Sequence, residues 1–134
     1  MYQAALKAYD SVNKSTMSGR DVEAAVLTKA AVALKKCQDH WVEAGRDDEL
    51  NAALKFNQRV WTIFQAELGR VDNPLPQNLK RDLLRLSAFI DQRSLEMLAY
   101  PSPEKLTILI SINHNIAAGL RSRPAPAENI QAAA

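Results

Sequence analysis

The side chains that most often carry out chemistry in proteins are few and scattered in this sequence. His40 and His114 stand far apart, and neither has a partner at the spacing of a metal site. Asp39 adjoins His40, but neighbouring side chains on a helix diverge. Cys37 is the only cysteine, and on an apolar helical face its buried thiol would be inert. Without a glycine-rich phosphate loop, the sequence predicts no catalytic residue, no metal, no cofactor and no enzyme activity.

Two asparagines occupy positions where apolar residues are the rule. Asn57 and Asn113 each fall in the centre of an apolar helical stripe. At ~100° per residue, His114 and Asn115 turn away from the stripe that holds Asn113. A polar residue in such a seam fixes the register of packed helices at a cost in stability. We predict structural roles for both amides, and a hydrogen bond between them would satisfy both, although the sequence does not show that they meet.

Helical elements must position these residues. Helices are expected over residues 19–44, 48–68, 77–99 and 103–121, where apolar residues recur in steps of three and four. Tyr2, Leu6 and Tyr9 form one face of a shorter helix at the N-terminus, which is marginal by itself and must dock to persist. The predicted fold class is all-α, an antiparallel helical bundle of four main helices plus a short N-terminal helix.

Length and charge set the domain organisation and the compartment. The 134 residues fit one domain, with residues 1–121 as the helical bundle and 122–134 as a disordered Pro/Ala-rich tail. A net charge of +2 does not favour nucleic acid or a membrane surface as partner. The single cysteine fits a reducing compartment, and the N-terminus lacks the features of a signal peptide. The expected localisation is cytoplasmic, with no membrane span.

The predicted helices carry more apolar surface than one seam requires. Residues 48–68 have a second stripe, and residues 77–99 have a shorter one; the stripes are Ala52, Phe56, Val60 and Ile63, and Leu84, Ala88 and Leu95. One interpretation is a core with several sides, partly covered by the N-terminal helix. Another is a surface that receives an amphipathic helix from a partner, with the N-terminal helix as its cover when the partner is absent. Both interpretations can hold together.

Longer motifs carry a family resemblance. In chain order they are N-Q-R-x-W at 57–61, NPLP at 73–76, FIDQRSLE at 89–96 and IN-x-NIAAGL at 112–120. Together they resemble the flagellar regulator FlaF family of alphaproteobacteria, from residue 1 to about 121. The resemblance implies a cytoplasmic, positive factor for flagellin synthesis and flagellum assembly, which acts as a flagellin-binding secretion chaperone. It also implies opposition to FlbT, the partner regulator that represses flagellin translation.

The second stripe is the preferred flagellin-binding surface under this hypothesis. Phe56, Val60 and Ile63 would make its apolar contacts, and Asn57 and Arg59 its orienting hydrogen bonds. Tyr2, Leu6 and Tyr9 would form a displaceable N-terminal cap.

Two alternatives replace direct flagellin binding by post-transcriptional regulation of flagellin mRNA. In one, the protein binds RNA; in the other, it acts as an adaptor that binds FlbT. The features that favour RNA are small basic groups, Lys35 and Lys36 in one helix and Lys80, Arg81 and Arg85 in another. Without an aromatic platform or a basic stripe, nucleic acid remains the weaker candidate.

Overall fold

The computed structural model describes residues 4–5 and 19–122. Four helices follow one another: α2 (Gly19–Asp39), α3 (Arg46–Leu68), α4 (Gln77–Ala99) and α5 (Pro103–Ser122). The described residues contain no strand, which confirms the all-α prediction. Of the predicted N-terminal helix, Ala4 and Ala5 are described and are helical, whereas Tyr2, Leu6 and Tyr9 lie outside the described residues. The predicted tail also lies outside them, except for Ser122 at the end of α5.

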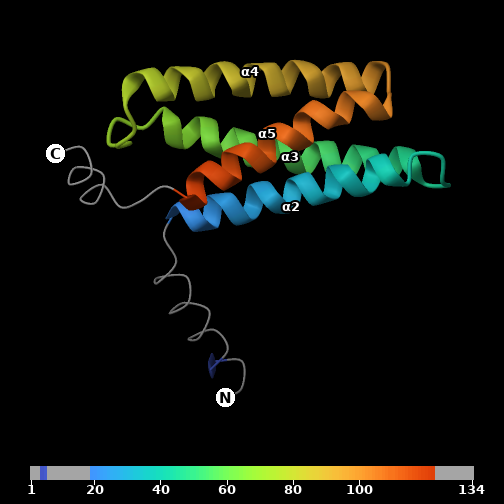
Figure 1. Ribbon diagram of the computed structural model, residues 1–134, viewed down its shortest axis with the longest axis horizontal. Helices are drawn as coiled ribbons and strands as arrows, with labels where there is room; N and C mark the ends of the chain where they lie inside the picture. The colour runs from blue at the N-terminus through green and yellow to red at the C-terminus, as the bar shows by residue number, and fades with distance from the viewer. Residues whose placement is uncertain (1–3, 6–18, 123–134) are drawn as a thin grey trace.

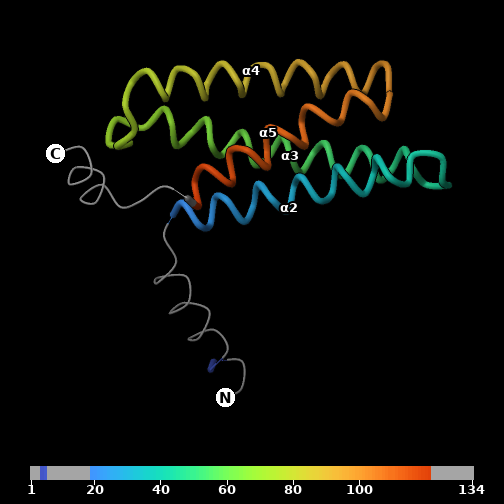
Figure 2. Tube along the Cα trace, viewed as in Figure 1, coloured from blue at the N-terminus to red at the C-terminus, as the bar shows by residue number. Residues whose placement is uncertain are grey.

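Successive helices run antiparallel and form a ring of four (Figure 1). α2 packs against α3 and α5, and α4 packs against the same two helices. The α2–α5 contact is the most extensive, whereas α4 and α5 touch over a short stretch. Figure 2 shows that α5 crosses obliquely, from α4 at its beginning to α2 at its end. The beginning of α4 and the end of α5 therefore diverge.

The core is formed by apolar side chains that recur in steps of three and four along the helices. The buried apolar side chains include, from all four helices, Leu27, Leu34, Cys37, Leu50, Leu54, Trp61, Phe64, Ile90, Met97, Leu106 and Leu109. Trp61 is fully buried, and its ring centroid lies 5.5 Å from that of Phe64. Both aromatic residues thus belong to the core, on the main stripe of α3, which also contains Leu50, Leu54 and Leu68.

The two seam asparagines meet in the middle of this core. The Nδ2 of Asn113 donates a hydrogen bond to the Oδ1 of Asn57 over 2.6 Å. The Nε1 of Trp61 donates to the Oδ1 of Asn113 over 3.0 Å. These bonds join α3 and α5, which face each other across the bundle. The predicted roles of both amides are confirmed, and His114 and Asn115 are exposed, as their helical phase predicts.

The connection between α2 and α3 differs from the prediction. α2 ends at Asp39 rather than near residue 44, and turns occupy residues 40–44. Gly45 has a φ of 84°, a left-handed conformation that glycine adopts without steric cost, and α3 begins at the next residue. The guanidinium of Arg46 then lies 4.4 Å from the ring centroid of Trp41. This contact covers the half-buried indole ring of Trp41. Trp41 falls within the predicted helix 19–44 but lies in the turn after α2.

Candidate functional site

An open apolar groove of about 800 Å³ lies where α4 and α5 diverge. Its apolar lining comes from α3, the α3–α4 connector, α4 and α5: Phe64, Leu68, Leu75, Leu79, Leu83, Ile116 and Leu120. The two α3 side chains are buried and form the floor, whereas the other five are half-buried and form the walls. Such a large, half-exposed apolar surface between two helices is typical of a binding site.

Small residues explain why α5 leaves α4. On α2, Ala24, Ala30 and Ala31 are fully buried, and on α5 Ala117 is fully buried. Side chains of this size let two helices approach closely, so the end of α5 lies against α2. The Arg121 side chain also donates a 3.0 Å hydrogen bond to the Thr28 hydroxyl there. Leu79 and Leu83, at the beginning of α4, are consequently left only partly covered.

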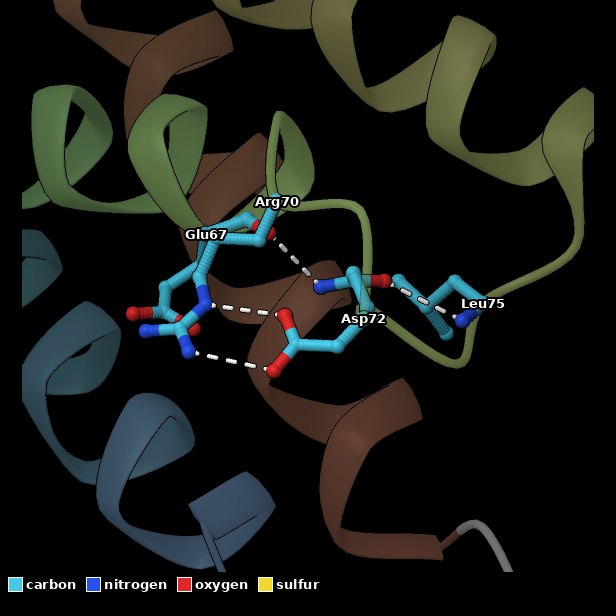
Figure 3. A network of polar contacts seen from close by, with 5 residues as sticks. Glu67, Arg70, Asp72 and Leu75 are labelled. Carbon is cyan, nitrogen blue, oxygen red and sulfur yellow. Dashed lines mark hydrogen bonds and ion pairs between the residues drawn. The ribbon is translucent and has the colours of Figure 1, made fainter.

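The connector between α3 and α4 lines one end of the groove, and Figure 3 shows the polar contacts that hold it. The Asn73 Nδ2 donates to the Glu67 carbonyl oxygen over 2.9 Å, and the Leu75 N–H donates to the Asn73 Oδ1 over 3.1 Å. Arg70 and Asp72 form an exposed ion pair at 3.0 Å on the same turn. These bonds, with the fixed φ of Pro74, hold Leu75 at the groove wall.

The groove is acidic where α2 begins. Glu23 of α2 and Glu67 of α3 both line it, together with Arg20. Burial raises the pKa of the Glu23 carboxyl above its ordinary value of 4.5, and the negative charge of Glu67 raises it further. The positive charge of Arg20 opposes this rise in pKa. We call this part of the groove, formed by Glu23 and Glu67, its acidic mouth.

Replacing Glu23 by glutamine should make the protein more stable at neutral pH. Because the folded-state pKa of Glu23 exceeds 4.5, the folded state binds more protons between pH 4.5 and that raised pKa. The free energy of unfolding therefore falls as the pH rises through this interval. The Glu23→Gln gain, measured by urea unfolding, should be present at pH 7 and shrink as the pH falls toward 4.5. An equal gain at every pH would contradict the proposed cause.

The five residues predicted to contact flagellin differ in their exposure to solvent. Val60 is 4% exposed and Asn57 is fully buried, so the prediction that they lie on a contact surface is wrong. The reason is that α3 packs against both α2 and α4, which buries two sides of it. Ile63 is 60% exposed and Arg59 is exposed, whereas Phe56 is half-buried with the Lys29 Nζ 5.5 Å from its ring centroid. None of these five residues lines the groove.

Other classes of site have little support in residues 4–5 and 19–122. No three His, Cys, Asp or Glu side chains in this part of the chain are placed to hold a metal ion together. No helix there is long and apolar enough to cross a membrane. Within the basic group on α4, Lys80 is only 9% exposed, and on α2 Lys35 pairs with Asp39 at 3.0 Å. The basic side chains thus do not form one accessible stripe.

Comparisons with known proteins identify the family. None of the curated proteins and none of the solved structures compared with the chain matches it. A family model described as flagellar protein FlaF matches residues 5–120. The match spans every residue that lines the groove and the asparagine pair. FlaF is not a known enzyme family, and its members are flagellar proteins. The chain therefore belongs to the FlaF family and has a role in building the flagellum.

Proposed function

We propose that this protein is a cytoplasmic flagellin-binding secretion chaperone, which promotes flagellin synthesis and flagellum assembly. The observation that supports this proposal best is the open apolar groove between α4 and α5. A subunit that polymerises through amphipathic helices needs those apolar faces covered until it is exported. A groove of this kind, on a protein of the FlaF family, provides such a cover.

The groove suits a helix because two helices form its walls. Leu79 and Leu83 lie one turn apart on α4, and Ile116 and Leu120 lie one turn apart on α5. A third helix between these ridges would pack as a bundle helix does, with anchors at positions i, i+3, i+4 and i+7. Its apolar face would bury the half-exposed walls and reach the floor at Phe64. The proposed ligand is therefore one amphipathic helix of flagellin.

This groove replaces the outer stripe of α3 as the proposed contact surface. Apolar side chains line the groove continuously. The outer stripe of α3, which is the second stripe of the sequence analysis, is interrupted because Val60 is buried in the core. Phe56, Arg59 and Ile63 remain accessible enough to serve a second partner, for which FlbT is our candidate. Under this proposal, the effect on flagellin synthesis follows from the fate of bound flagellin, without contact between the protein and RNA.

Mixing the purified protein with monomeric flagellin should yield a one-to-one complex. Size-exclusion chromatography with light scattering would measure its mass at micromolar concentrations, where a groove of buried aliphatic anchors should hold a helix. The separate proteins provide the control masses. Failure to co-elute would contradict the chaperone proposal and favour the adaptor or the RNA-binding alternative. Co-purification with FlbT in the absence of flagellin would favour the adaptor.

A further inference from the structure

We propose that the N-terminal segment of the same chain docks in the groove when no partner helix is bound. Its Tyr2, Leu6 and Tyr9 face would lie against the half-buried walls at Leu83 and Ile116. The consequence for flagellin binding rests on the proposed function, whereas the docking itself does not.

The position of the segment supports this occupant. The described helix α2 begins at Gly19, and Gly19 itself lines the groove. Residues 10–18 join the Tyr2–Tyr9 face to this point, and nine extended residues reach about 30 Å. The face can therefore fold back along the groove. The tether also gives the segment a millimolar effective concentration there, so weak docking suffices.

The chemistry of the segment matches that of the groove. Tyr2, Leu6 and Tyr9 recur at i, i+4 and i+7, one face of a helix, and Ala4 and Ala5 are helical in the structure. A helix this short is marginal in water and gains most of its stability from packing. The two tyrosines combine an apolar ring with a polar tip, which suits an apolar hollow with a polar rim.

The charges agree with the same placement. Residues 1–18 contain two lysines, Lys7 and Lys14, and one acidic residue, Asp10, so the segment carries a net positive charge, and it joins the groove beside the acidic mouth. Glu23 and Glu67 repel each other there, so a nearby cation would relieve the repulsion. Ala4 and Ala5 are exposed in the described conformation, in which the groove is open. The proposal is thus an equilibrium between an open and a covered groove.

A spin label on the segment tests the docking without flagellin. Gln3→Cys places a nitroxide beside the apolar face in the full-length protein, while the native Cys37 is buried and unreactive. We expect the label to broaden the methyl signals of Leu83, Ile116 and Leu120 in NMR spectra. A label at Ala44→Cys, in the turn between α2 and α3, is the control that should leave these signals sharp.

Two substitutions decide whether the apolar face causes the broadening. Leu6→Glu changes the middle of the face and should abolish it, whereas Ala4→Glu, on the opposite side of the helix, should preserve it. Sharp groove signals in the Gln3→Cys protein would overturn the proposal. Broadening would also count against it if it appeared only between molecules, in a mixture of spin-labelled and isotope-labelled protein, because the occupant would then be a second copy.

The affinity for flagellin provides a separate readout. If the segment covers the groove in about nine molecules of ten, Leu6→Glu should tighten flagellin binding about tenfold, because the competent fraction rises to one. An unchanged affinity, together with sharp groove signals, would overturn the cap but leave the chaperone proposal standing. Broadened groove signals in a protein that does not bind flagellin would support the cap and contradict the chaperone proposal.

Discussion

Replacing Asn113 by alanine should lower the free energy of unfolding by about 3–5 kcal/mol. The substitution removes the acceptor of the Trp61 indole N–H and the donor to the Asn57 Oδ1, and all three side chains are fully buried. The Asn57 Nδ2 already lacks a hydrogen-bond partner among the described residues, so its amide would lose the one bond that the structure gives it. Each stranded polar group costs about 1–3 kcal/mol, and the lost amide leaves a cavity.

Urea unfolding followed by far-ultraviolet circular dichroism measures this loss. The matched comparison removes the whole network: Asn57→Leu, Trp61→Phe and Asn113→Leu in one protein leave none of these polar groups unpaired. We expect this triple variant to be more stable than Asn113→Ala, because an apolar replacement of a buried polar cluster is often neutral or stabilising. A loss below about 1 kcal/mol for Asn113→Ala would mean that the three side chains do not form the network.

The asparagine pair was predictable because helical phase determines which residues face inward. Asn57 and Asn113 sit between apolar residues at steps of three and four, and no alternative phase takes them out of the seam. The order and antiparallel sense of the helices followed similarly from short connectors. What the pattern could not give was the partner of each amide, because a stripe states which face is buried and not which helix covers it.

The groove was missed for this same reason. Leu79 and Leu83 carry the pattern of core residues, and so do Ile116 and Leu120, so the sequence places all four inside. Their partial exposure results from the tilt of α5 toward α2, which a one-dimensional pattern does not contain. The usable signal was the size of these residues: α2 and α5 both carry buried alanines, while the beginning of α4 carries leucines. Close approach on one side implies separation on the other.

Val60 illustrates the opposite error. The second stripe of α3 has two interpretations from the sequence, a further side of the core or a partner surface, and the predicted flagellin contacts follow the second. In a ring of four, however, each helix contacts two neighbours, so α3 buries both Trp61 on one seam and Val60 on the other. Of the other residues of this stripe, Ala52 and Ile63 remain exposed and Phe56 is half-buried.

Two glutamates in the groove should weaken flagellin binding about 100-fold or more. Leu83→Glu and Ile116→Glu replace half-exposed wall residues, each of which would contribute about 1 kcal/mol when a helix buries the rest of it. The unpaired carboxylates would add a desolvation cost of about 1–3 kcal/mol on binding, and 1.4 kcal/mol corresponds to a factor of ten. Isothermal titration with flagellin measures the change in affinity.

The matched control places the same charges on the outer stripe of α3. Phe56→Glu and Ile63→Glu add two negative charges to the same protein, but neither residue lines the groove. This pair should change flagellin affinity less than threefold at physiological salt, because exposed charges act weakly over distance. Loss of binding in the control and retention in the groove variant would return the contact surface to the outer stripe.

Gly119→Leu should weaken flagellin binding without introducing charge. Gly119 lines the groove, and a Cβ built on it meets no atom within 4 Å, so a leucine side chain would enter the hollow rather than the core. Leucine also favours the helix over glycine by roughly 0.5–1 kcal/mol, so the variant should unfold at a higher temperature than the parent. Ala118→Leu, one position away on an exposed site that does not line the groove, is the control for the added side chain.

Gly119→Leu should raise the stability of the fold while it lowers the affinity for flagellin, so the two effects can be told apart. Overpacking a fitted interface costs about 1–3 kcal/mol, so Gly119→Leu should bind flagellin roughly 5- to 150-fold more weakly although its fold is more stable. A destabilised fold cannot explain such a loss, unlike a loss caused by the glutamates. If Gly119→Leu binds as tightly as Ala118→Leu, the flagellin helix does not occupy the groove between α4 and α5, whatever the charge variants show.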